Sequence, residues 1–282
     1  MTKVRGARQP QIIAFGGCGV ADEWADPRVF RYVLAATGAS SPEVALITAA
    51  SGNDHALTMK LHRMFRRLGA STQHLPVERT AGIADGVPQV QDFDLIHVEG
   101  GNTTYLMHQL RDSGFDRVLS EAWGRGVVLS GTSAGASCWF SRAISASPFS
   151  CFEAQVAVAP VRGLGLIDRS LCVHYDRSPI RRREYHEQVA GGLEAGFGLD
   201  HDAGLHFVGT ELAAVITRRP GASASVVKWR DGEVMVRRLE AQSVGERTWG
   251  EWLGQAVNPM VRMLRRHMPH RVQAMARRSD GE

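Results

Sequence analysis

The fold of this chain is decided by the stretch Gly126-Val127-Val128-Leu129-Ser130-Gly131-Thr132-Ser133-Ala134-Gly135. Its apolar first half predicts a buried strand, and the segment 136–141 that follows is predicted to be helical. A sharp turn from strand to helix holds its central residue in a strained conformation, and only small flanking residues let the two chains pass. The pattern therefore predicts an α/β fold with a serine presented at the carboxyl edge of a sheet.

That serine, Ser133, is a candidate nucleophile. Its turn would lie at the start of a helix, where backbone N–H groups and the helix dipole favour developing negative charge. The alternative interpretation is that Gly-x-Ser-x-Gly is only a flexible turn, because short motifs also occur by chance. The strand before the motif and the helix after it favour a catalytic role.

Most of the chain alternates short apolar runs with amphipathic segments of helical length, which is typical of a parallel sheet flanked by helices. The predicted strands are 11–15, 44–48, 72–77, 95–98, 127–130 and 166–174. The predicted helices are 28–36, 55–68, 103–112, 116–125 and 180–193. Residues 145–165 are predicted to form a loop, and residues 213–238 to form antiparallel strands. The fold class is thus α/β, with a mostly parallel central sheet and an antiparallel C-terminal extension of that sheet.

The composition is ordinary for a soluble globular protein. Of the 282 residues, 44% are hydrophobic and 22% are charged, which excludes a disordered chain or a fibrous repeat. No apolar run reaches the length of a membrane span, and the basic segment 1–10 does not resemble a signal peptide, so we expect a cytoplasmic protein. The cysteines lack the spacing of a zinc site or a disulfide framework, and neither a metal nor another cofactor is expected. They are Cys18, Cys138, Cys151 and Cys172.

The C-terminal segment 241–282 is rich in arginine, although the net charge of the chain is only +4. Apolar residues recur in it at roughly helical spacing, which predicts a basic helical extension after a domain that spans residues 11–240. Such a helix could contact a membrane surface, a nucleic acid or a partner subunit. The simpler interpretation is a helix with a solvated arginine face laid on the domain, so no nucleic-acid or membrane partner is expected.

The loop Phe15-Gly16-Gly17-Cys18-Gly19 follows a predicted strand and invites a nucleotide-binding interpretation. The Rossmann fingerprint needs a further glycine where Asp22 stands, and an acidic side chain there would repel a pyrophosphate. The lysine of a P-loop is absent as well. Nucleotide binding is therefore disfavoured.

A serine hydroxyl is a poor nucleophile until a base accepts its proton. His174 is the best candidate for that base, because it ends the apolar run 171–173 and is predicted to lie at a carboxyl edge with Ser133. His97 lies inside a predicted strand and is expected to be packed. The other histidines lie in helical or loop segments. A histidine at a strand end can also be purely structural, and the nearby serine turn is what favours a base.

A third group should orient the imidazole of the base and stabilise its cation. Glu153 is ranked first, because it lies between the nucleophile and the base in the chain order serine, acid, histidine. The alternatives are Asp168, Asp176 and Asp202. Asp176 could instead begin a turn or cap the helix that follows.

An oxyanion hole would need two donors near Ser133. One is the backbone N–H of Ala134, and the second is expected from the loop that contains Gly100 and Gly101, where glycine allows close approach to a ligand. Asn102 adds a side-chain donor and a cap for the helix that begins at residue 103. The alternative is that this loop is an ordinary turn from strand to helix.

Three of these segments resemble the peptidase E and cyanophycinase family of serine peptidases: Gly100–Thr103, Gly131–Ala136 and Leu171–Tyr175. The segments Gly16–Gly19 and Ala50–Gly52 are also similar to members of that family. The resemblance implies a fold similar to that of class I glutamine amidotransferases. It also implies Ser133 as nucleophile, His174 as base, and an oxyanion hole formed by Gly101 and Ala134.

The substrates of that family are dipeptides with an N-terminal aspartate or β-linked aspartyl-arginine units, and both carry a carboxylate. Arg181, Arg182 and Arg183 follow His174 and could form a bidentate clamp for such a group. The alternative is a solvated basic start of a helix, because arginine clusters are usually surface features.

The leading hypothesis is a hydrolase that acts on small peptides through an acyl-enzyme at Ser133, with His174 as general base. The alternative is a binding or regulatory module without catalysis on an amidotransferase-like scaffold, because fold does not imply function. Glutamine amidotransfer is disfavoured, since the similar fold uses a cysteine at this turn for that chemistry. The sequence is compatible with a homodimer and does not fix the oligomeric state.

Overall fold

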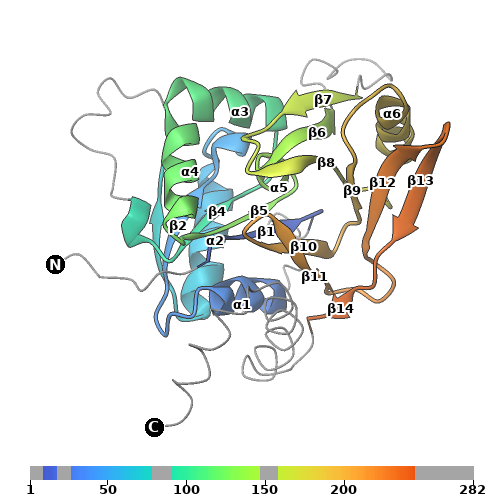
Figure 1. Ribbon diagram of the computed structural model, residues 1–282. Coiled ribbons are helices and arrows are strands. Elements are labelled where there is room, and N and C mark those ends of the chain that lie inside the picture. The colour runs from blue at the N-terminus through green and yellow to red at the C-terminus, as the bar shows by residue number, and fades with distance from the viewer. Residues whose placement is uncertain (1–8, 18–26, 78–89, 147–157, 245–282) are drawn as a thin grey trace, which may run out of the picture. The chain divides into compact units, whose positions relative to one another are not determined.

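The computed structural model describes residues 9–17, 27–77, 90–146 and 158–244 (Figure 1). Glu153 and nearly all of the predicted C-terminal extension lie outside these residues. Within them, no helix combines the length and the apolar character that a membrane span requires. Cys138 and Cys172 are buried free thiols, as expected for small packed side chains.

The first sheet contains eight strands, and its centre is parallel. In spatial order they are β14 (Gln242–Ser243), β11 (Glu211–Thr217), β10 (Ala203–Val208), β1 (Gln11–Phe15), β5 (Val128–Thr132), β4 (Leu95–Val98), β2 (Glu43–Ile47) and β3 (Ser71–His74). Strands β1, β5, β4, β2 and β3 are parallel, whereas β10 and β11 continue the sheet in antiparallel fashion. The predicted parallel sheet with an antiparallel extension is confirmed.

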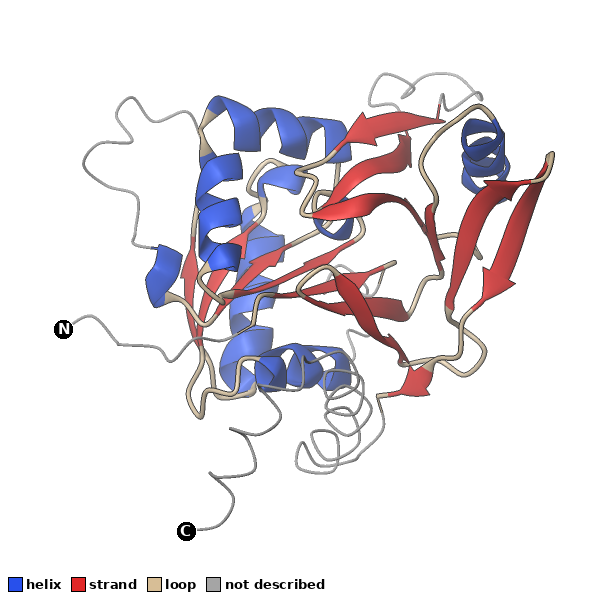
Figure 2. Cartoon of the chain, in the orientation of Figure 1, coloured by secondary structure: helices blue, strands red, loops and turns tan. Residues whose placement is uncertain are grey.

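Helices cover both faces of this sheet (Figure 2). They are α1 (Pro27–Ala36), α2 (His55–Arg67), α3 (Thr103–Asp112) and α4 (Phe115–Gly124), with the short 3₁₀ helices η1 (Ala49–Ser51) and η2 (Val90–Asp92) between strands. Successive residues of β4 serve opposite faces. Val98 belongs to the buried cluster that contains Leu106 of α3, whereas the ring of His97 lies 5.4 Å from that of Phe65 on α2. His97 is thus packed in the core, as predicted.

A second sheet of six strands follows the serine turn. In spatial order its strands are β13 (Glu233–Arg238), β12 (Ala224–Arg230), β9 (Gly196–Leu199), β8 (Ile167–Val173), β6 (Phe140–Ala146) and β7 (Val158–Arg162). Helix α6 (Pro179–Ala190) packs on it and buries Tyr185 and Val189 in a cluster with Ile144 and Val227. The strands expected at 213–238 are therefore divided between two sheets, with β11 in the first and the β12–β13 hairpin in the second.

Two local predictions in this region are wrong. The helix expected at 136–141 is a single turn, α5 (Ala134–Ser137), because the chain then pairs with β8 as strand β6. The loop expected at 145–165 contains β7, which pairs with β6. In both cases pairing with distant strands overrides the local pattern, which a sequence window does not contain.

Strands β9 and β10 were also missed, because glycines interrupt their apolar pattern. A Cβ built on Gly198 would lie 2.6 Å from the ring of Tyr175, and one on Gly204 would lie 2.7 Å from the ring of Phe15. These glycines are therefore compatible with strands, because an aromatic ring packs directly on each backbone.

The turn after β5 depends on two close backbone contacts. A Cβ on Gly131 would overlap the carbonyl oxygen of Gly135, and a Cβ on Gly135 would overlap the carbonyl oxygen of Val98 at the end of β4. Only glycine allows α5 to begin this close to β4 and β5. The small residues on either side of Ser133 are thus a packing requirement.

We expect Gly135→Ala to lower the free energy of unfolding by about 2–3 kcal/mol, because the added methyl group meets backbone that cannot move aside. The free energy is measured by urea denaturation. Gly124→Ala is the matched control, since a Cβ at this last residue of α4 has no atom within 4 Å, and it should change stability by less than about 1 kcal/mol. Equal effects of the two substitutions would contradict the packing argument.

Candidate active site

Ser133 lies at the turn between β5 and α5, with a φ of 51° and a ψ of −109°. Positive φ is rare for a residue with a side chain and costs on the order of 1–3 kcal/mol. The backbone N–H of Ser133 donates to the carbonyl oxygen of Phe15 at 2.9 Å, which ties the turn to the end of β1. The serine is thus held in a strained conformation by its neighbours.

His174 directly follows β8 and also has a positive φ, of 55°. Its N–H donates to the carbonyl oxygen of Gly16 at 3.2 Å, so the end of β8 meets the end of β1. The Nε2 atom of His174 lies 2.8 Å from the Oγ atom of Ser133. The sequence placed the two residues at one sheet edge, but the structure brings them together from two different sheets.

The predicted oxyanion donors lie beside the serine. A Cβ built on Gly100 would lie 3.3 Å from the Cβ of Ser133, so this loop passes directly over the nucleophile. Among the described residues, neither the N–H of Gly101 nor that of Ala134 has an acceptor. Ala134 begins α5, where the N–H groups of the first turn have no partner within the helix. One donor without a partner thus belongs to the residue after Ser133, and the other belongs to the loop that passes beside Ser133.

A buried carboxylate joins the donor loop to the nucleophile strand. Glu99 is 2% exposed, and it accepts a hydrogen bond from the hydroxyl of Thr132 and another from the N–H of Gly100 at 2.9 Å. His97 Nε2 lies 3.4 Å from the same carboxylate. Burial raises the pKa of Glu99, but His97 and the two hydrogen bonds outweigh this and hold the pKa below its usual value. Glu99 is thus an anion that fixes the residue before Ser133 and the residue before Gly101.

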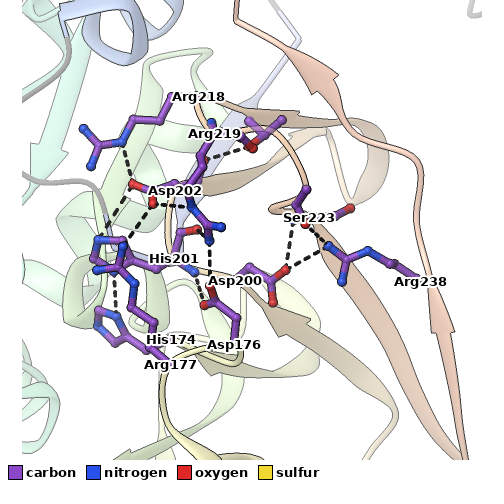
Figure 3. Close-up of polar contacts among 12 residues, drawn as sticks. His174, Asp176, Arg177, Asp200, His201, Asp202, Arg218, Arg219, Ser223 and Arg238 are labelled. Atoms are coloured by element: carbon purple, nitrogen blue, oxygen red, sulfur yellow. Dashed lines mark hydrogen bonds and ion pairs between the residues drawn. The ribbon is translucent and has the colours of Figure 1, made fainter.

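The far side of the His174 ring faces a second imidazole. The Nδ1 atoms of His174 and His201 are 3.1 Å apart, and His201 is 7% exposed (Figure 3). Among the described residues, no carboxylate forms a hydrogen bond with His174. Glu153, the acid ranked first from the sequence, lies outside the described residues.

The other three candidate acids have different surroundings. Asp168 lies near the amino end of β8, away from His174, and accepts a hydrogen bond from Ser141 at 3.0 Å. Asp176 accepts from the backbone N–H of His201 at 2.7 Å. Asp202 Oδ1 lies 3.8 Å from His201 Nε2. Two of the three acids therefore contact His201 rather than His174.

The glycine loop after β1 has a packing role at this site. A Cβ on Gly17 would overlap the ring of His174 and lie 2.5 Å from the ring of His201. The φ of Gly17 is 149°, which a side chain would disfavour. Gly17 thus gives both imidazoles room, which explains the glycine that suggested a nucleotide loop.

The predicted substrate-binding residues contact groups other than Ser133 and His174. Asn102 caps α3, and its side chain accepts from the N–H of Tyr105 at 3.0 Å. Arg182 is exposed and places its guanidinium 5.9 Å from the centroid of the Tyr175 ring. Arg183 is also exposed and lies 3.7 Å from Glu187.

Arg181, the first residue of the arginine triplet, is half-buried near the imidazole of the candidate base. It forms no ion pair with any described residue, and its charge disfavours protonation of His174. Burial, followed by Arg181 and His201, lowers the pKa of His174 from 6.5 to about 4. The imidazole is therefore neutral at pH 7 and able to accept a proton.

The sequence reasoning missed two residues of this centre, His201 and Glu99. His201 was assigned to a loop because β9, the strand before it, was not recognised. Glu99 directly precedes the loop that contains Gly100, and the sequence reasoning gave it no role. The available signal was its place at the end of an apolar run, where a charged residue must find buried partners.

Comparisons with known proteins agree on one family. The model of peptidase family S51 matches residues 12–215. YgaJ, an uncharacterized peptidase of Bacillus subtilis (strain 168), is 32% identical over 236 residues, which cover 83% of this chain and 99% of the relative.

Two crystal structures share the fold. A peptidase from an acI-B1 Actinobacterium superposes with a TM-score of 0.63 at 20% identity, and the match covers 84% of this chain and 96% of the other. A candidate peptidase E from Listeria monocytogenes EGD-e superposes with a TM-score of 0.51 at 17% identity and covers 82% of this chain and 100% of its own. These two likenesses show the fold of the chain.

Glu99→Gln should slow the labelling of Ser133 by a fluorophosphonate about tenfold, because it removes the negative charge that holds Thr132 and Gly100 and places an NH₂ group opposite His97 Nε2, which now contacts a carboxylate oxygen. Labelling is followed by intact-protein mass spectrometry. Asp94→Asn is the matched control, since Asp94 is a buried carboxylate at the opposite end of β4 that accepts from the N–H of Glu43 at 3.0 Å. If Asp94→Asn slowed labelling equally, Glu99 would have only a general role in stability.

Proposed function

Because the chain belongs to peptidase family S51 and is a serine-type peptidase, we propose that Ser133 attacks the peptide carbonyl and that His174 accepts the proton of its hydroxyl. The resemblance of three segments to the peptidase E family is confirmed at the level of the family. The observation that carries the proposed mechanism is the 2.8 Å contact between Ser133 Oγ and His174 Nε2.

The reaction proceeds through a covalent acyl-enzyme. As Ser133 Oγ bonds to the carbonyl carbon, negative charge develops on the carbonyl oxygen and is stabilised by the N–H groups of Gly101 and Ala134. His174 then gives the proton to the leaving amine. In the second half of the reaction, water attacks the acyl-enzyme, His174 accepts the proton of the water, and the proton is then returned to Ser133 as the acyl group leaves. Strain at Ser133 keeps its hydroxyl in position, so no rearrangement is needed before attack.

Small peptides that carry a carboxylate are the proposed substrates. The half-buried guanidinium of Arg181 has no ionic partner among the described residues and lies near His174, so a substrate carboxylate would supply the missing charge. Arg182 and Arg183 are more exposed, and their charges would attract the carboxylate of the substrate from a distance. Peptides with an N-terminal aspartyl or isoaspartyl residue fit this requirement.

Ser133→Ala and His174→Ala should each lower kcat/KM by at least about 10³-fold, because each removes a group on which bond formation depends. Turnover is measured on a dipeptide panel that includes Asp-X, isoaspartyl-X and uncharged peptides. Turnover that survives both substitutions would refute the mechanism. Absence of turnover, together with absence of fluorophosphonate labelling of the wild type, would favour a binding module.

We expect kcat/KM to stay constant down to about pH 5 and to reach half its maximum near pH 4, because only neutral His174 accepts the serine proton. A histidine with its ordinary pKa of 6.5 would lose activity at higher pH. The groups that set this pKa, besides burial, are Arg181, His201, Asp176 and Arg177.

Folding must be monitored at each pH, because burial also lowers the pKa of His206 to about 4. Both histidines are neutral when folded and bind protons more readily when unfolded, so the free energy of unfolding falls as the pH falls from 6.5 to 4. Circular dichroism gives the folded fraction. A half-maximal rate near pH 6.5 in fully folded protein would contradict the expected pKa.

A further inference from the structure

The group behind the candidate base is unusual for a serine hydrolase, because it is an imidazole. His201 follows β9 and is buried, and its ring is tilted by 30° from that of His174 with the ring centroids 5.3 Å apart. The close approach is between the two Nδ1 atoms, at 3.1 Å. That distance is a hydrogen bond, so one of the two nitrogen atoms carries a proton and the other accepts it.

The contact with Ser133 decides which nitrogen carries the proton. For His174 to act as a base, its Nε2 must accept the hydroxyl of Ser133, so the proton of the neutral ring is on Nδ1. His174 therefore donates to His201 Nδ1. The proton of His201 is then on Nε2, which lies 3.8 Å from Asp202 Oδ1. The four side chains form a chain of contacts in one direction, from Ser133 to Asp202, and Figure 3 shows the part of it from His174 to Asp202.

The position of His201 is fixed through its main chain. Its N–H donates to Asp176 at 2.7 Å, and its carbonyl oxygen accepts from Arg219 at 3.3 Å. The next residue, Asp202, has a φ of 71° and donates its N–H to the carbonyl oxygen of Gly17 at 3.0 Å. These contacts hold the main chain of His201 independently of His174.

Asp202 supplies a fixed negative charge at the end of this chain. It is 4% exposed and is hydrogen-bonded to the Nε atoms of Arg218, at 2.6 Å, and of Arg219, at 2.9 Å. Burial raises the pKa of Asp202, but the two arginines outweigh this and lower the pKa below its usual value. The carboxylate therefore stays ionised at neutral pH and faces the second imidazole.

We propose that His201 is the positioning residue of this site and takes the place that a carboxylate occupies in most serine hydrolases. It holds the His174 tautomer whose free Nε2 faces Ser133, and it takes up part of the positive charge that His174 acquires during the reaction. This inference rests on the proposed function of Ser133 and His174.

Protons move at both imidazole rings during formation of the acyl-enzyme. In the attack step, the O–H bond of Ser133 breaks, its Oγ atom bonds to the carbonyl carbon, an N–H bond forms at His174 Nε2, and the carbonyl π pair moves to oxygen. The Nδ1 proton of His174 shifts toward His201 Nδ1, so the positive charge is divided between two rings. When the amide C–N bond breaks, the electron pair on oxygen re-forms the carbonyl, the Nε2 proton goes to the leaving nitrogen, and the shared proton returns to His174 Nδ1. Both rings are then neutral again.

Charged groups around the pair act in both directions. The acids Asp176 and Asp202 favour a shared cation, whereas Arg177, Arg181 and Arg219 oppose it. A full positive charge on His174 alone would have no carboxylate partner among the described residues. Division of the charge over two rings moves part of it toward Asp202, which is why a second imidazole is useful here.

The test compares His201→Ala with His201→Glu in the full chain. We expect His201→Ala to lower kcat by about 100-fold with KM changed less than about threefold, because substrate contacts remain and orientation of the base is lost. His201→Glu should recover most of kcat. It should also move the acid limb of the kcat/KM profile upward by about one pH unit or more, because a carboxylate favours protonated His174.

His206→Ala is the matched control. His206 is a buried histidine of β10 that contacts Tyr32 at 2.7 Å and Gln11 at 2.9 Å, outside the site. It should lower stability and leave kcat within about twofold in folded protein. A His201→Ala variant that keeps kcat within threefold, or a His201→Glu variant with no shift of the acid limb, would overturn the assignment. The assignment would also be overturned if Glu153→Gln lowered kcat as much as His201→Ala does and altered the pH profile of kcat/KM, because Glu153 would then be the positioning residue.

A measurement without substrate separates this inference from the proposed function. In ¹⁵N-histidine-labelled protein, the Nδ1 proton shared by the two rings should give a strongly downfield signal that persists in Ser133→Ala and disappears in His201→Ala. A downfield signal in a protein without turnover would refute the proposed function alone. Turnover that depends on Ser133, in a protein without that signal, would refute the role of His201 alone.

Discussion

The close passage of backbone at Gly131 and Gly135 is the constraint on which the rest of the site depends. Because α5 begins against the carbonyl oxygen of Val98, the chain must turn within one residue, and that residue is Ser133 with its positive φ. The same turn redirects the chain from the first sheet into β6, the first strand of the second. One steric contact thus positions the serine and starts the element that leads to His174.

The two sides of Ser133 each have a buried carboxylate, but the two carboxylates have different partners. On one side, Glu99 is an anion whose partners are mainly neutral donors, and it fixes backbone. On the other side, Asp202 is an anion surrounded by arginines, and it lies beyond two imidazoles. Neither carboxylate contacts Ser133. The charges are therefore arranged around the neutral pair of Ser133 and His174, which suits the proposed role of His174 as a base that is unprotonated before the reaction.

The sequence predicted those features that depend on local rules. The order of apolar runs indicated the parallel sheet, and the small residues around Ser133 indicated the turn, because each of these patterns lies within a short stretch of the chain. His174 was found for the same reason, at the end of a clear apolar run. His201 was not, because β9 is interrupted by Gly196 and Gly198, whose partners lie elsewhere in the sequence.

The division into two sheets was hidden for a related reason, since strand partners separated by many residues leave no mark in a local window. It has a consequence for how this protein loses activity. The hydrogen bond between Ser133 and His174 joins a residue that follows a strand of the first sheet to one that follows a strand of the second. It therefore forms only while the two sheets stay packed together. A slight loosening of the second sheet would separate the two atoms while both sheets keep their own pairing. On the proposed mechanism, inactivation and unfolding are then distinct events, and the range of conditions in which the protein is active is narrower than the range in which it remains folded.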